Sequence, residues 1–119
     1  MILKISMKRG EIWLINLDPT VGAEIRKSRP AVIVNDDALG KLPLKIIVPL
    51  TDWKDHYSIA PWMIKIKPDS INNLSKTSAD DCFQVRSVSV EPITKMIGNI
   101  SEIQMKKINS GLASVLKIT

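Results

Sequence analysis

Two polar residues at the ends of apolar runs have side chains suited to phosphate chemistry. Arg29 comes directly before Pro30 and the β-branched run Ala31–Val34, and Thr51 follows the apolar run Lys45–Leu50. A guanidinium stays charged, and its planar fork of donors matches two phosphate oxygens. A hydroxyl beside it can fix the orientation of the phosphate. We therefore interpret Arg29 and Thr51 as a minimal site for a phosphodiester.

RNA is the phosphodiester that such a minimal site could cleave, because its 2′-hydroxyl is a built-in nucleophile. A protein must orient this hydroxyl in line with the phosphorus, remove its proton and stabilise charge on the phosphoryl oxygens and the leaving group. Arg29 suits the last task, but arginine, with a pKa above about 12, is a poor base. The proton acceptor is therefore left open. In the structural alternative, Arg29 is a solvated loop end and Thr51 forms a turn with Asp52.

The polar stretch from Pro19 to Arg29 predicts a long exposed loop, and loops of that length are often functional. Within it, Glu24, Arg26 and Lys27 are candidate substrate-binding residues, with a local ion pair around Glu24 as the alternative reading. Trp53, between Asp52 and Lys54, is expected to be exposed and to stack on a base. Trp13 and Trp62 are expected in the core.

The overall composition fits one folded domain covering residues 1–119, with residues 1–6 as an N-terminal extension if Met7 is the natural start. The net charge of +5 favours a polyanionic partner, although many small proteins are mildly basic for no specific reason. No apolar run is long enough to span a bilayer, so we expect a cytoplasmic protein without a membrane partner.

The single cysteine and the single histidine restrict the chemistry further. Cys82 cannot form an intrachain disulfide, and no pair of residues suits a zinc site, so we expect neither a metal nor a cofactor. We expect Cys82 to be buried and His56 to lie on the surface.

Short apolar runs predict a mainly β domain. Strands are expected at Gly10–Leu17, Ala31–Val34, Lys45–Leu50, Trp62–Lys67, Cys82–Val90 and Ile93–Ile97. So many short strands suggest a small antiparallel barrel, closed or half-closed, since closure removes exposed edges. The C-terminal segment changes to a helical period: Ser101 and Gln104 form a capping box, and Ile108 and Leu112 share its apolar face.

Three blocks of sequence resemble the MazF/PemK toxins. The stretch Arg9–Val34 carries the RGEIW opening, the L-D-P-T turn, G-x-E and then R-P before an apolar strand. Val48–Thr51 (VPLT) resembles the second family block, and Cys82–Val88 (CFQVRSV) the third. The C-terminal helix also fits, so the resemblance covers most of the chain.

This resemblance implies a small SH3-like barrel of the MazF/PemK/CcdB type with a C-terminal helix, usually a homodimer. It also implies the toxin of a type II toxin–antitoxin system, a metal-independent and ribosome-independent endoribonuclease. Such an enzyme cuts single-stranded RNA to a 2′,3′-cyclic phosphate and a 5′-hydroxyl, and an acidic antitoxin inhibits it. By position, Arg29 and Thr51 match the catalytic pair, Glu24 the loop glutamate, and Gln84 and Arg86 the RNA-contacting third block.

One position departs from the family pattern. Some members carry an aspartate, proposed as an acid–base group, directly before the glutamine of the third block, and Phe83 stands there in this chain. Asp80 and Asp81 lie just upstream, but a slip of one residue would turn a side chain to the other face of a strand. We assign neither of them a catalytic role from the sequence.

Two other functions fit the same fold. One is a non-enzymatic toxin that binds DNA gyrase, which would not need the Arg29 and Thr51 pair. The other is a plain nucleic-acid-binding barrel, which the net charge permits. The sequence specifies neither the RNA motif that is cut nor the class of RNA.

Overall fold

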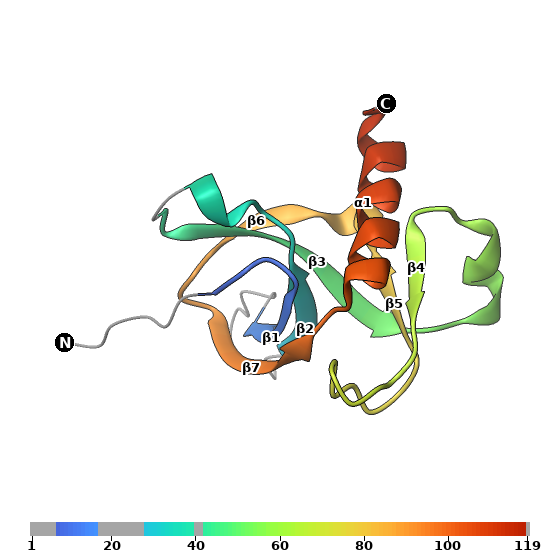
Figure 1. Ribbon diagram of the computed structural model, residues 1–119, viewed down its shortest axis with the longest axis horizontal. Coiled ribbons are helices and arrows are strands. Elements are labelled where there is room, and N and C mark those ends of the chain that lie inside the picture. The colour runs from blue at the N-terminus through green and yellow to red at the C-terminus, as the bar shows by residue number, and fades with distance from the viewer. Residues whose placement is uncertain (1–6, 17–27, 40–41, 119) are drawn as a thin grey trace, which may run out of the picture.

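The fold is one antiparallel sheet with a C-terminal helix against it (Figure 1). The computed structural model describes residues 7–16, 28–39 and 42–118. Its strands are β1 (Glu11–Asn16), β2 (Ser28–Ile33), β3 (Leu44–Asp52), β4 (Met63–Ile66), β5 (Ser78–Asp81), β6 (Arg86–Ser89) and β7 (Ile93–Asn99). The helix is α1 (Glu102–Leu116), and the short 3-10 turns are η1 (Asp37–Leu39), η2 (Asp55–Ile59) and η3 (Cys82–Gln84).

The strand order is β4-β5-β3-β2-β1-β7, and β6 pairs with β3 beside β5. The predicted mainly β fold with a C-terminal helix is thus confirmed. Of the two expected forms, a closed or a half-closed barrel, full closure is wrong for the part of the chain that the structure describes, where the sheet stays open with β4 and β7 at its two ends. The long strand β3 pairs with two strands along one edge, first with β6 and then with β5.

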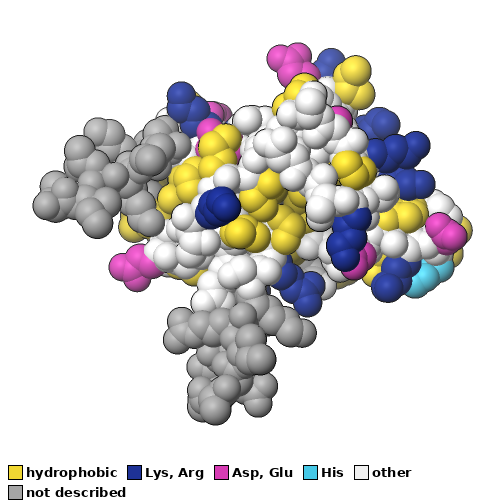
Figure 2. Space-filling view, turned by 90° about the horizontal axis from the view of Figure 1, so that it is seen from below, with side chains coloured by type: hydrophobic (Ala, Val, Ile, Leu, Met, Phe, Trp, Pro, Cys, Tyr) yellow, Lys and Arg dark blue, Asp and Glu magenta, His cyan; other side chains and the backbone are white. Residues whose placement is uncertain are grey.

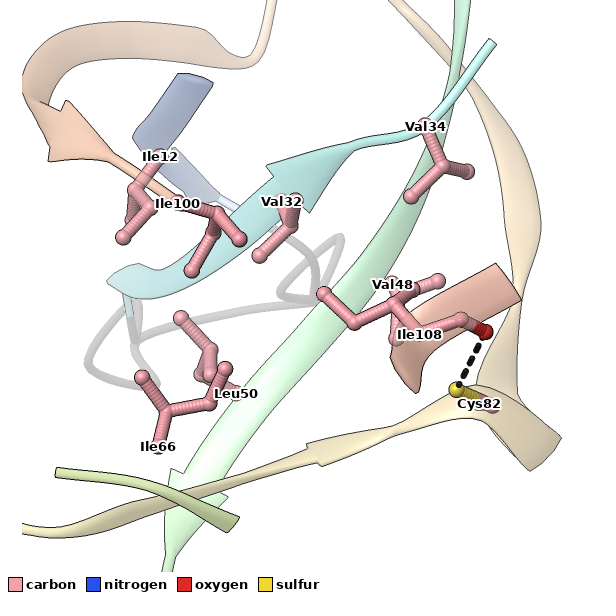
Figure 3. Packing of buried hydrophobic residues seen from close by; sticks show 9 residues of the cluster. All are labelled: Ile12, Val32, Val34, Val48, Leu50, Ile66, Cys82, Ile100 and Ile108. Atoms are coloured by element: carbon pink, nitrogen blue, oxygen red, sulfur yellow. Dashed lines mark hydrogen bonds between the residues drawn. The ribbon is translucent and has the colours of Figure 1, made fainter. Parts of the chain in front are cut away.

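Both faces of the central strands are buried, because neighbouring side chains point to opposite sides of a strand. On one face the odd-numbered residues Trp13, Ile15, Ala31, Ile33 and Ile47 form a cluster with Met7, Val88 and Ile93. On the other face the even-numbered residues Ile12, Val32, Val48 and Leu50 pack with Ile66, Cys82 and Ile108 (Figure 3). Two cores explain why the run Ala31–Val34 has no polar position.

Helix α1 covers the second core as predicted. Ser101 caps it, its hydroxyl accepting a hydrogen bond of 3.2 Å from the Gln104 backbone N–H. The second hydrogen bond of the capping box, from the Ser101 backbone N–H to the Gln104 side chain, is not formed, since the buried side-chain oxygen of Gln104 has no partner among the described residues. Ile108 is fully buried, and Leu112 packs against the same cluster.

Gly111 lets α1 approach η3 closely. A Cβ at this position would lie 2.8 Å from the Cys82 sulfur, and the Cys82 thiol donates a 3.7 Å hydrogen bond to the Ile108 carbonyl. Cys82 is buried, as expected. Burial, followed by the nearby charges of Asp80 and Asp81, raises the pKa of the Cys82 thiol to about 12. The sulfur is therefore a packing group.

The residues of the RGEIW motif, Arg9–Trp13, form hydrogen bonds that connect different parts of the fold. The Arg9 guanidinium donates to the Val34 carbonyl and to the Asn109 side chain on α1. Gly10 has φ of +91°, a conformation that favours glycine. The Glu11 carboxylate accepts from the Trp13 indole at 3.0 Å, and Trp13 is core as expected. This motif is therefore structural and contributes no group to the site described below.

Two predicted boundaries are wrong in ways that matter for the site. Strand β2 begins at Ser28, so Arg29 belongs to the strand and pairs with Ile15 of β1. The predicted strand Cys82–Val90 is broken, since Cys82–Gln84 form η3 and only Arg86–Ser89 form a strand. The Asp81 side chain starts this turn by accepting a hydrogen bond from the Phe83 N–H at 3.1 Å.

Candidate active site

The candidate site lies where β3 changes partner. Strand β6 pairs with β3 as far as Ile47, and β5 pairs with it from Leu50 onward. Pro49 lies between these two paired stretches of β3. Proline has no backbone N–H, so the gap leaves no N–H of this residue without a hydrogen-bond partner. The chain between β5 and β6 turns through η3 at the same place. The gap between the two partner strands leaves a pocket of about 350 Å³.

The pocket collects polar side chains from distant parts of the sequence. It is lined by Arg29, Pro49, Leu50, Thr51, Tyr57, Met63, Asp81, Gln84 and Arg86. The residues come from strands β2 to β6 and from η2 and η3. An adjoining hollow of about 250 Å³ shares Arg29, Leu50 and Thr51 and adds Pro30, Asp52 and Ser78.

Strand register brings the two predicted catalytic residues together. Ala31 pairs with Pro49, and Arg29 and Thr51 lie two residues beyond these partners on β2 and β3. Residues two apart on a strand share a face, which puts both side chains on the pocket side of the sheet. Thr51 also pairs with Ala79 of β5. Arg29 is exposed and Thr51 half-buried, so both can meet a ligand from solvent.

The same alternation separates the two aspartates of β5. Asp81 lines the pocket, whereas Asp80 is fully buried on the opposite face, and neither of its oxygens has a hydrogen-bond partner among the described residues. Burial, and to a smaller extent the charge of Asp81, raises the pKa of Asp80 well above its usual value. Burial therefore favours the uncharged form of Asp80 in the folded protein.

The other predicted substrate-binding residues fall into three groups. Gln84 and Arg86 are exposed and line the pocket. Glu24, Arg26 and Lys27 lie outside the described residues. Trp53 does not line the pocket: it is half-buried, with the Lys65 ammonium 5.1 Å from its ring centroid.

Tyr57 is the aromatic residue that the structure brings to the pocket. Its ring packs edge-on against Trp53, with centroids 5.7 Å apart, and beside His56 at 4.7 Å. His56 is exposed on η2, as expected. No sequence pattern points to Tyr57, because the turn η2 carries no apolar period. The sequence does show Asp81, but it does not specify the face of the sheet on which its side chain lies.

One face of the molecule is mixed in character. Figure 2 shows Lys and Arg side chains gathered along one edge of a face whose middle is apolar. No helix of the described residues is long and apolar enough to cross a membrane. The described residues also contain no group of three His, Cys, Asp or Glu side chains placed to hold a metal ion.

Comparison with known proteins gives the family. The chain matches the model of the PemK-like, MazF-like toxin of type II toxin–antitoxin system over residues 8–116. It is 30% identical to the endoribonuclease PemK of Escherichia coli over 95% of this chain and 84% of that protein. It is 27% identical to the endoribonuclease MazF9 of Mycobacterium tuberculosis, covering 89% of this chain and 92% of the relative.

A solved structure supports the fold independently. An endoribonuclease in complex with its cognate antitoxin from Mycobacterial species superposes with a TM-score of 0.76 at 18% identity, covering 96% of this chain and 98% of that one. The family model spans nearly the whole chain, and the matched residues include all those that line the pocket. The chain belongs to the PemK-like, MazF-like toxins of type II toxin–antitoxin systems.

Proposed function

We propose that this chain is an endoribonuclease that cuts single-stranded RNA without a metal ion and without the ribosome. The observation that carries the proposal is that Arg29, Thr51 and Arg86 line one open pocket. The names of the relatives, endoribonuclease PemK and endoribonuclease MazF9, support it.

In this proposal the RNA phosphate sits between the two arginines. Arg29 binds two phosphoryl oxygens with its fork of donors, and the Thr51 hydroxyl fixes their orientation. Arg86 adds positive charge where negative charge develops during the reaction. The adjacent 2′-hydroxyl attacks the phosphorus, and the products are a 2′,3′-cyclic phosphate and a 5′-hydroxyl. Gln84, Trp53 and the loop residues Glu24, Arg26 and Lys27 contact neighbouring nucleotides.

The partner that we propose is an acidic antitoxin acting in the cytoplasm. The similar mycobacterial endoribonuclease was solved with its cognate antitoxin, which supports a protein inhibitor for this chain. Carboxylates on an antitoxin tail would occupy the place of RNA phosphates against Arg29 and Arg86 and fold on binding. We further propose that two copies of the chain form a symmetric homodimer.

The deciding experiment incubates the pure protein with end-labelled single-stranded RNA in EDTA. Cleavage to fragments with a cyclic phosphate is expected. Retention of the RNA without cleavage would instead indicate a binding protein. Neither cleavage nor retention would favour the gyrase-directed alternative, which a DNA gyrase assay then tests.

A further inference from the structure

Asp81 is the carboxylate that the fold brings into the pocket. Asp80 pairs with Leu50, so the register of β5 and β3, continued by one residue, places Asp81 across from Pro49. Pro49 and Thr51 share a face of β3, and Asp81 lines the pocket together with Thr51 and Arg29. Its position in the pocket is therefore a consequence of the sheet register.

The side chain of Asp81 is also fixed in orientation. One carboxylate oxygen accepts the hydrogen bond from the Phe83 N–H that starts η3. Phe83 itself points away, with 63% of its surface exposed and its ring edge-on to Trp62 at 5.6 Å. The residue that aligns with the family's acid–base position thus lies outside the pocket, and the carboxylate two positions earlier lies inside it.

One carboxylate and two arginines line the pocket together. Asp81 is the one carboxylate among the described residues that line this pocket, and its charged neighbours there are Arg29 and Arg86. Asp52 lines only the adjoining hollow, where its carboxylate pairs with Lys76 at 3.2 Å. Arginines are poor proton acceptors, so the carboxylate is the one of these three charged side chains that can accept a proton.

We propose that Asp81 is the general base of the RNA cleavage proposed above, on which this inference rests. The 2′-hydroxyl proton passes to the Asp81 carboxylate while the bond from the 2′-oxygen to phosphorus forms. The bond from phosphorus to the 5′-oxygen breaks, and its electron pair leaves on that oxygen, which takes a proton from water. Asp81 then returns its proton to solvent, and no oxidant or metal enters the balance.

The test is the single-turnover rate of Asp81→Asn on saturating labelled RNA in EDTA. Asparagine keeps an oxygen that can cap η3 but loses the basic carboxylate. The rate is expected to fall about 100–10,000-fold, the usual contribution of a general base. RNA affinity should stay the same or rise, because one negative charge beside two arginines has gone. Asp55→Asn, at an exposed position that lines neither hollow, makes the same charge change and should cleave at the wild-type rate.

A second variant guards against misfolding. Asp81→Ser can also cap the turn, and a melting curve shows which variants are folded. Wild-type-like cleavage by either folded variant would overturn the role of Asp81, as would a loss of RNA affinity that accounts for the whole loss of rate. If the wild-type protein leaves RNA intact, the proposed function itself has failed, which is a different result from cleavage that survives in Asp81→Asn.

Discussion

The backbone of Arg29 is restricted in conformation. The residue lies in strand β2, paired with Ile15, and Pro30 after it restricts it to extended conformations. The side chain of Arg29 therefore extends into the pocket from a fixed backbone position. A preorganised donor of this kind costs little reorganisation when charge develops on the phosphate.

We predict that Arg29→Ala lowers the single-turnover cleavage rate about 100–1,000-fold, as removal of one preorganised donor does. Lysine at this position should restore part of the rate, because it keeps the charge but loses the two-pronged geometry. RNA affinity should fall much less, since several cations share the contact with the backbone. Wild-type-like cleavage by a folded Arg29→Ala protein would remove this residue from the mechanism.

Asp80 predicts a dependence of stability on pH. The pKa of Asp80 is raised in the folded protein, so above the ordinary aspartate value of about 3.9 the unfolded chain loses this proton while the folded chain keeps it. Stability is then lost as the pH rises from that value towards the folded pKa. Asp80→Asn, which is uncharged in both states, should melt higher than wild type at pH 7, and the difference should vanish near pH 3. An equal shift at both pH values would show that ionisation of Asp80 is not the cause.

The sequence predicts part of the candidate site because the family blocks mark Arg29, Thr51, Gln84 and Arg86, and all four line one pocket. It could not place Asp81. Which face an aspartate takes depends on register with β3, and no local pattern in the sequence specifies that register. Tyr57 is not predicted either, because its place in the pocket depends on how the turn η2 folds after β3.

The junction between α1 and η3 is closely packed. Gly111 is a poor helix residue, by about 1 kcal/mol relative to alanine, yet a Cβ there would lie 2.8 Å from the Cys82 sulfur. The gain in helix propensity is therefore opposed by a clash with a buried atom.

We expect Gly111→Ala to lower the free energy of unfolding by about 1–3 kcal/mol, the usual cost of overpacking. Ser114→Ala, at an exposed position of the same helix, is the matched control and should be neutral or slightly stabilising. Urea denaturation measures both. Adding Cys82→Ala should make the Gly111→Ala change less costly, and independence of the two changes would contradict the packing argument.

The turn η2 gives the pocket its aromatic wall. Trp53 supports the ring of Tyr57 from the side, and Tyr57 lines the pocket. Tyr57→Ala should weaken binding of single-stranded RNA about 5–150-fold, the range for loss of one stacked base. Tyr57→Phe should bind like wild type, because the ring alone stacks. Fluorescence anisotropy with labelled RNA measures both, and equal loss in both variants would implicate the hydroxyl instead.

The strands that sequence reasoning found are those with their own apolar pattern, such as Glu11–Asn16 and Leu44–Asp52. Strand β5 has the sequence SADD and no β-branched residue. It is a strand because β3 and β4 pair with it on its two sides. Conversely, the alternation in Cys82–Val90 predicted one strand, but the cap formed by Asp81 turns the chain at its start. Long-range pairing therefore makes β5 a strand, and a local cap ends the regular strand pattern at Cys82.

The whole molecule is expected to be a dimer of twice the 13.3 kDa of one chain. Light scattering at micromolar concentration measures the mass directly. A monomeric mass would contradict the dimer without contradicting the proposed chemistry.

A synthetic acidic peptide with the sequence of an antitoxin tail should inhibit cleavage competitively, and high salt should weaken that inhibition because the attraction is between charges.

The pairing of β3 with both β5 and β6 has a consequence for protein synthesis. The groups around the pocket come from β2 to β6, so the pocket is incomplete until Arg86 has left the ribosome. At about 5–20 residues per second, the stretch from Arg29 to Arg86 takes roughly 3–11 seconds to make. The helix that covers the second core follows these residues in the chain and emerges after them. A nascent chain therefore exposes Arg29 before the proposed site is complete, and RNA at the ribosome is not expected to be cut by that chain until Arg86 has emerged.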